Sequence, residues 1–237
     1  MSKNYSFSLS ERLTAIKKMV NGGTVLCDVG TDHGFLPISL VLDGEVERAI
    51  AMDLREGPLS RAKEHVEEYG LSDRIETRLS DGLVKVEPGE CDLVSITGMG
   101  GRTMMGIIEG NRAVAFSVKH LILQPQSELP EFRKYLYDNG FVIIDEECVY
   151  EDGKYYFLMK TARGEGKISE LDANFGPILL QKKHPVLMEY IEKEIRVNEN
   201  VRENLLKAAA TEKNRESLKK HEIKAKLLKE AKERLKI

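Results

Sequence analysis

The chain of 237 residues has 41% apolar residues, a formal net charge of −3 and three scattered cysteines. This length allows one α/β domain with a sizeable core plus a small appendage. No apolar stretch reaches transmembrane length and no signal peptide is recognised, so we expect a cytoplasmic protein without membrane contact. Cys27, Cys91 and Cys148 form no C-x-x-C pair, which argues against a metal site or a disulfide framework.

The most informative stretch is residues 25–34, where an apolar run ends in Asp28 and is followed by Gly30 and Asp32. With a helix expected over Leu36–Leu42, this pattern predicts the first strand, turn and helix of a doubly wound, Rossmann-like α/β domain. A dinucleotide fingerprint has glycine where this chain has Asp32. A carboxylate there would repel a pyrophosphate but attract a cationic ligand, so the loop favours S-adenosyl-L-methionine over NAD. By itself, the loop is equally compatible with an ordinary strand-to-helix turn.

Three later strand ends carry residues suited to the same ligand. The second predicted strand ends at Asp53, where an acidic residue can bond a ribose diol. Asp81 follows the third strand and can accept a hydrogen bond from an adenine amine, although an Asp-Gly turn is the simpler interpretation. The fourth strand is closed by a glycine-rich loop that lets a flat ring approach the backbone. The candidate cofactor-binding residues are Asp28, Gly30, Asp32, His33, Asp53, Leu54, Asp81, Gly82, Gly98 and Met99.

The remaining part of the sheet favours a methyltransferase over a dehydrogenase. A fifth apolar strand, His120–Leu123, precedes a helix expected over Glu131–Asn139. Two further strands, Phe141–Ile144 and Tyr155–Lys160, flank an Asp-Gly turn signal and are expected to form a hairpin. A parallel sheet with a terminal β-hairpin is typical of class I methyltransferases.

Nearly the whole chain, from Leu9 onward, resembles the bacterial tRNA (adenine-22-N1)-methyltransferases. The likeness is carried by Leu9–Leu13, Asp28–His33, Ile96–Gly101, Leu121–Gln126, Glu151–Tyr156 and Gly176-Pro177. The chain departs from the family at Gln126, where relatives are expected to have Asn. The resemblance implies methyl transfer from S-adenosyl-L-methionine to N1 of adenine 22 in tRNA. The substrate-binding candidates are Arg12, Gly100, Gly101, Gln124 and Pro125.

Asp32 is the candidate catalytic residue. Adenine N1 has an in-plane lone pair and loses no proton before attack, so the enzyme must mainly align the reacting atoms. The methylated ring is cationic, and a nearby carboxylate would stabilise the developing charge and accept a hydrogen bond from the exocyclic amine. Cofactor positioning or turn capping is an equally good interpretation of Asp32. Because N1 is paired in a duplex, the base must be extruded or already accessible.

The two parts of the chain carry opposite net charges. Residues 1–166 carry a balance of −8 and residues 167–237 a balance of +5. Arg163–Gly166 is expected to be a linker between a methyltransferase domain (1–163) and a helical appendage (167–237). Long helices over Val186–Ala210 and Arg215–Leu235 suggest an antiparallel coiled-coil hairpin.

The basic balance of this appendage fits a polyanionic partner, although any single lysine is better explained by a solvated face. The resemblance implies that the appendage helps to hold tRNA. We expect no metal and a monomer or weak homodimer.

Three other functions remain open from the sequence. An NAD-dependent oxidoreductase is disfavoured by Asp32 and by the terminal hairpin. A noncatalytic tRNA-binding protein is disfavoured because all four strand-end motifs are present. A methyltransferase acting on another RNA position or on a small molecule is the main alternative.

Overall fold

The computed structural model describes residues 8–208 and 211–236, and the chain divides into two compact units, Met1–Lys167 and Ile168–Ile237. The first unit extends past the expected boundary at residue 163. Arg163 is the last residue of a strand and is paired with Phe141, and the Gly164 N–H donates to the Gly140 carbonyl at 3.0 Å. The segment expected to be a linker therefore begins as part of the sheet.

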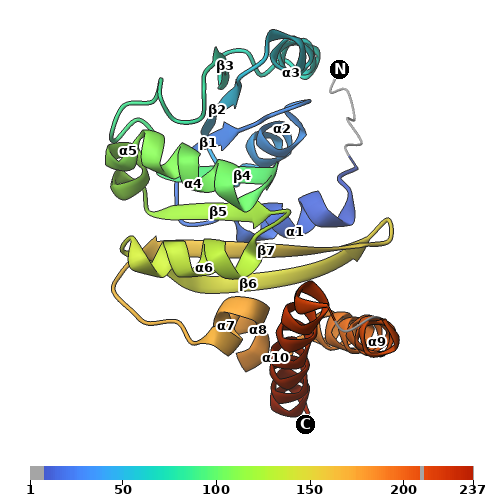
Figure 1. Ribbon diagram of the computed structural model, residues 1–237. Coiled ribbons are helices and arrows are strands. Elements are labelled where there is room, and N and C mark those ends of the chain that lie inside the picture. Colours follow the sequence, from blue (N-terminus) through green and yellow to red (C-terminus); the bar gives the residue numbers. More distant parts are fainter. Residues whose placement is uncertain (1–7, 209–210, 237) are drawn as a thin grey trace. The chain divides into compact units, whose positions relative to one another are not determined.

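The first unit is built on a seven-stranded sheet in the order β3-β2-β1-β4-β5-β7-β6 (Figure 1). The strands are β1 (Val25–Val29), β2 (Arg48–Asp53), β3 (Ile75–Leu79), β4 (Leu93–Met99), β5 (His120–Pro125), β6 (Phe141–Glu151) and β7 (Lys154–Arg163). Strands β1 to β5 run parallel, while β7 is antiparallel to both β5 and β6. The expected parallel sheet with a terminal hairpin is confirmed. Strands β2 and β3 lie on one side of β1, and β4 and β5 lie on the other, so the strand order reverses between β1 and β4. Ligands bind at such switch points.

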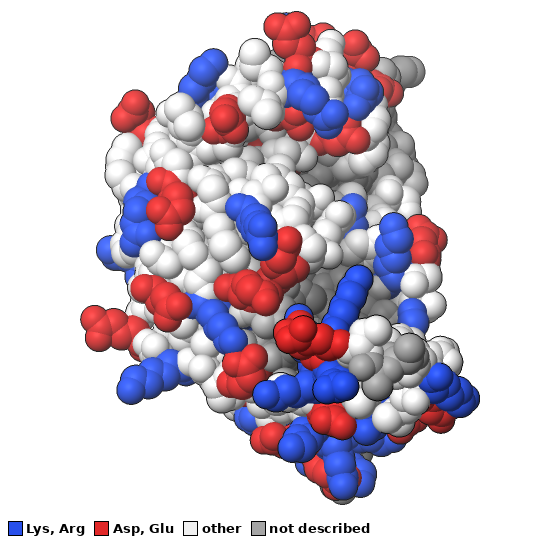
Figure 2. Space-filling model, in the orientation of Figure 1, with Lys and Arg blue, Asp and Glu red and all other residues white. Residues whose placement is uncertain are grey.

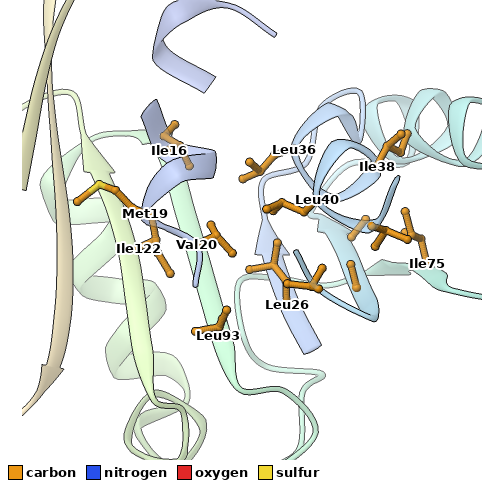
Figure 3. Packing of buried hydrophobic residues seen from close by; sticks show 14 of the residues in the cluster. Ile16, Met19, Val20, Leu26, Leu36, Ile38, Leu40, Ile75, Leu93 and Ile122 are labelled. Carbon is orange, nitrogen blue, oxygen red and sulfur yellow. The ribbon is translucent and has the colours of Figure 1, made fainter. Parts of the chain in front are cut away.

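Helices cover both faces of this sheet. They are α1 (Glu11–Met19), α2 (Phe35–Leu42), α3 (Glu56–Glu68), α4 (Gly101–Gly110), α5 (Arg112–Ser117) and α6 (Leu129–Asp138). Helix α1 is capped by Ser10, whose hydroxyl oxygen accepts a hydrogen bond from the Leu13 N–H. Figure 3 shows α1 and α2 packing on β1, β4 and β5 through Ile16, Leu36 and Ile122. These contacts form the apolar core between the helices and this face of the sheet.

The β6–β7 hairpin is longer than the sequence indicated. The strands were expected to end at Ile144 and begin at Tyr155, but they continue to Glu151 and from Lys154. Asp152 and Gly153 both have positive φ, 49° and 79°, as a two-residue type I′ turn requires. The Asp-Gly turn prediction was therefore right, and the error lay in strand length.

The second unit is helical. It contains α7 (Glu170–Phe175), α8 (Pro177–Gln181), α9 (Pro185–Lys207) and α10 (Glu212–Leu235). Helices α9 and α10 pair antiparallel, with Lys232 against Glu192 at 2.9 Å and Lys224 against Glu194 at 2.7 Å. The expected hairpin is present, although the predicted end of its first helix at Ala210 lies outside the described residues. The described helices include none that is long and apolar enough to cross a membrane.

A fully buried ion pair joins the β6–β7 hairpin to α6. Arg133 Nε donates to Glu146 Oε1 at 3.0 Å, and neither side chain is exposed to solvent. The Arg133 guanidinium also lies 5.8 Å from the centre of the Phe157 ring. Both charges have lost their hydration, so removal of one partner leaves the other charge buried without compensation.

Glu146→Ala should therefore lower the free energy of unfolding by about 3–5 kcal/mol, as measured by urea denaturation. Lys63→Ala breaks an exposed pair with Glu67 on α3 and should change stability little. Equal, small effects of the two substitutions would show that the buried pair is not needed for stability.

Candidate functional site

A cleft of about 370 Å³ opens at the carboxyl ends of β1 and β4, at the switch point of the sheet. Its volume falls within the range of about 300–1,000 Å³ that is usual for small-molecule sites. Its lining consists of Arg12, Leu13, Asp28, Gly30, Thr31, Asp32, His33, Gly34, Phe35, Leu36, Thr97, Gly98 and Gln126. Six of these were candidates from the sequence: Arg12, Asp28, Gly30, Asp32, His33 and Gly98.

The loop after β1 is held in a conformation that requires glycine. Gly30 has φ +80°, and a Cβ at this position would collide with the methyl group of Met99 at the end of β4. The N–H groups of Gly30 and Thr31 both donate to the Met52 carbonyl at 2.8 Å. The loop is therefore tied to β2 on one side and packed against β4 on the other.

Asp28 places a carboxylate in the floor of the cleft. It is buried, and this burial raises its pKa above the ordinary Asp value. Ser95 Oγ donates to Asp28 Oδ1 at 2.6 Å and acts in the opposite direction by stabilising the ionised form. A cationic ligand in the cleft would further favour the carboxylate.

Asp32 is the second carboxylate and lies on the rim, with 59% of its side chain exposed. Its pKa is lowered, chiefly by a hydrogen bond from Arg61 on α3 and also by the nearby His33, whose Nε2 is 3.6 Å from Oδ2. Asp32 is therefore ionised at neutral pH and available as a hydrogen-bond acceptor.

The opposite wall is organised by a buried amide, Gln124. Its Oε1 accepts from the Gly98 N–H at 3.1 Å and from Arg12 Nη1 at 3.3 Å. The Arg12 guanidinium also lies 5.4 Å from the centre of the Tyr156 ring. Gln124 was a substrate-binding candidate, but its fully buried side chain instead joins α1, β4 and β5 behind the wall.

Other candidates lie near the strand ends but outside the cleft lining. Asp53 ends β2, and its Oδ1 accepts from the Arg55 N–H at 2.8 Å. Leu54 and Asp81 are exposed, whereas Gly82 packs against Ile107 of α4. Pro125 is buried at the end of β5. In residues 8–208 and 211–236, no group of three His, Cys, Asp or Glu side chains is arranged to hold a metal ion.

Gly100 and Gly101 have a packing role that the sequence did not reveal. A Cβ at Gly101 would lie 2.7 Å from the Ser127 carbonyl oxygen, and one at Gly100 would lie 3.0 Å from Ser127 Oγ. Their small size lets α4 approach the loop that follows β5. Gln126 of that loop lines the cleft beside Gly98, so the position that departs from the family pattern faces the site.

Several residues of the cleft were not candidates from the sequence. Leu13, Thr31, Phe35, Leu36 and Thr97 line it, and their residue types give no functional signal on their own. Arg61, the partner of Asp32, comes from the middle of α3 and could be found only from the folded structure.

Comparison with known proteins gives a consistent result. Residues 9–159 match the family described as "Methyltransferase domain". A tRNA (adenine(22)-N(1))-methyltransferase of Bacillus subtilis is 34% identical over 228 residues, covering 94% of this chain and 96% of the relative.

Two solved structures are similar over nearly the whole chain. The crystal structure of the B. subtilis m1A22 tRNA methyltransferase aligns with a TM-score of 0.87 and 32% identity, covering 96% of this chain and 100% of that one. A Streptococcus pneumoniae protein crystallised with S-adenosyl-L-methionine aligns with a TM-score of 0.85 and 34% identity, covering 95% and 100%.

The raised pKa of Asp28 predicts how its replacement alters stability with pH. Between the unfolded and folded pKa values, the native state binds more protons than the unfolded chain, so stability falls as pH rises. Asp28→Asn removes this titration. The stability of the variant relative to wild type, without ligand, should therefore increase as the pH rises from about 4 toward the raised pKa of Asp28. Urea denaturation across this range measures the difference, and a difference that does not vary with pH would contradict the assignment.

Proposed function

The chain belongs to the tRNA (adenine(22)-N(1))-methyltransferase family, and we propose that it transfers a methyl group from S-adenosyl-L-methionine to N1 of adenine 22 in tRNA. The observation that carries this proposal is the acid-lined cleft at the β1–β4 switch point, in a sheet whose β7 is antiparallel. Methyl transfer to unmodified tRNA, followed by mapping of the modified base, tests it. A tRNA with guanine at position 22 is the matched control substrate.

S-adenosyl-L-methionine fits the residues of this site. When bound, it supplies an electrophilic methyl group on a positively charged sulfur. Asp28 and Asp32 provide negative charge on the floor and the rim of the cleft, and Gly30 lets the backbone approach a ligand closely. Asp53, at the end of the neighbouring strand β2, is assigned to the ribose hydroxyls.

The other assignments follow the strand order. Leu54, Asp81 and Gly82 would hold the adenine ring of the cofactor, because they follow β2 and β3. Gly98 and Met99 end β4 beside Gly30, and His33 lies next to Asp32. Gly100 and Gly101 would act on substrate binding by letting α4 approach the loop after β5, which carries Gln126.

Two alternatives fit the structure less well. A dinucleotide-binding oxidoreductase usually has a sheet ordered 3-2-1-4-5-6, without the antiparallel strand inserted here between β5 and β6. A vestigial tRNA-binding protein would have no use for a buried Asp28, whose ionised form is costly without a ligand. The similar sequence and the similar solved structure are both those of methyltransferases.

The chemistry that the protein must perform is alignment and charge stabilisation. Asp32, kept ionised by Arg61, would accept a hydrogen bond from the exocyclic amine and so orient N1. The same carboxylate would stabilise the positive charge that develops on the methylated ring. Arg12 is held by Gln124 and Tyr156, so its remaining donors have a fixed direction for a substrate phosphate or base edge.

Asp32→Asn keeps the shape of the side chain but removes its charge. We expect the single-turnover rate to fall by about 10–1,000-fold, because charge stabilisation at the transition state is lost, while tRNA binding changes much less. Asp43→Asn, which removes an exposed carboxylate paired with Lys17, is the matched control. A near-normal rate for Asp32→Asn would leave this residue with a positioning role only.

The helical unit is proposed to provide much of the binding energy for tRNA. It holds 17 Lys and Arg against 12 Asp and Glu, whereas the remainder of the chain is acidic. Figure 2 shows Lys and Arg side chains crowded over α9 and α10, with Asp and Glu between them. This gathering of basic side chains supports contact with a phosphate backbone, which binds proteins through many weak charge interactions.

A chain ending at Lys167 stops where the first unit ends. It should retain its affinity for S-adenosyl-L-methionine but bind tRNA at least about tenfold more weakly at matched salt, because most candidate phosphate contacts are removed. Calorimetry and filter binding measure the two affinities, and circular dichroism checks that the shortened chain is folded. If the folded, shortened chain binds tRNA as tightly as the full chain, the helical unit does not provide the tRNA-binding surface.

A further inference from the structure

Three aromatic rings form a cluster at the mouth of the cleft. His33 and Phe35 come from the loop before α2 and its first turn, and His65 comes from α3. The His33 and Phe35 centroids are 5.1 Å apart at 10°, and the Phe35 and His65 centroids are 5.1 Å apart at 16°. His33 and His65 are 5.6 Å apart at 24°, so all three rings are nearly parallel.

The cluster is fixed in place by the backbone. His65 Nδ1 lies at hydrogen-bond distance, 2.8 Å, from the His33 carbonyl oxygen. Gly34, with φ +71°, packs against Ala62 of α3 and lets the loop approach that helix closely. The rings are therefore organised before any ligand arrives, which lowers the entropy cost of binding to them.

These rings are not part of the hydrophobic core. Phe35 is 36% exposed and 39% of the His33 side chain is exposed, and both line the cleft. The exposed part of a flat ring at the mouth of a cleft can stack a nucleobase. Asp32 adds a hydrogen-bond acceptor next to His33, and the Arg61 guanidinium adds positive charge.

This combination matches an amino-bearing purine nucleotide. The rings offer a stacking surface, the carboxylate accepts from an exocyclic amine, and the cation attracts a phosphate. The residues assigned to the adenosyl part of the cofactor, Asp53 and Asp81, follow β2 and β3 and do not line this cleft. Phe35 and His65 are thus left without an assigned role in cofactor binding, and His33 joins them to the loop that carries Asp32.

We propose that the His33–Phe35–His65 cluster is the platform on which the target adenine stacks after it leaves the RNA, with its amine toward Asp32. This inference rests on the proposed function. Phe35 is then a substrate-positioning residue of the site. The platform holds the base with N1 free, because stacking uses the ring face and leaves the ring edge available.

Phe35→Leu tests the platform by keeping an apolar side chain without an aromatic face. Leu42→Ala, at the other end of α2 and similarly exposed at 38%, is the matched control, and Phe35→Trp should restore stacking. The readout is the fluorescence of 2-aminopurine placed at position 22 of the tRNA, which is quenched while the base stacks in the RNA or on an aromatic ring and is bright when the base is extruded without a stacking partner. Thermal melting confirms that each full-length variant is folded.

We expect the probe to stay quenched when it is bound by wild type, Leu42→Ala and Phe35→Trp, and to become bright when it is bound by Phe35→Leu, where the extruded base has no aromatic ring to stack on. With ordinary tRNA, Phe35→Leu should lower the single-turnover rate by about 5–100-fold while its affinity for S-adenosyl-L-methionine stays unchanged. Unchanged quenching in Phe35→Leu, or a loss of cofactor affinity alone, would overturn the platform. Failure of wild type to methylate adenine 22 would instead overturn the proposed function, and the quenching signal would still report stacking.

Discussion

The site depends on the way in which the loop after β1 is held. Two consecutive N–H groups, of Gly30 and Thr31, share the Met52 carbonyl, and the Met99 methyl group fills the space that any larger residue than glycine would need. These contacts join β1, β2 and β4 at the switch point. Because the loop is fixed, Asp28 lies beneath the cleft and Asp32 lies on its rim. A looser loop would leave the two carboxylates without a defined spacing.

The residues of the site lower the stability of the folded protein. Burial of Asp28 disfavours its ionised form, and Phe35 keeps 36% of its surface exposed instead of joining the apolar core. Stability is supplied elsewhere in the same unit, by the apolar contacts beneath α1 and α2 and by the enclosed pair of Arg133 and Glu146. Such a division is common, because a binding site must keep polar and apolar groups available to a ligand.

The charge distribution sets a second constraint. A methyltransferase unit with an acidic balance suits a cationic cofactor but repels an RNA backbone at long range. Local cations in that unit, Arg12 and Arg61, are each paired or oriented by neighbours and so act at short range. The basic balance of the helical unit offsets the repulsion. This arrangement separates attraction of the polyanion from recognition of the base.

The sequence by itself determined which segments form the strands, the Asp-Gly turn and the paired long helices, since each is encoded in a few neighbouring residues or in one periodicity. It indicated the cofactor class through Asp32, because a charge in a glycine-rich loop has a local meaning. Only the tertiary structure decided that Gln124 is buried behind the wall and that Arg61 holds Asp32. It also brought His65 beside Phe35. These contacts join residues 29 to 112 positions apart, and no local pattern specifies which distant side chains a folded chain brings together.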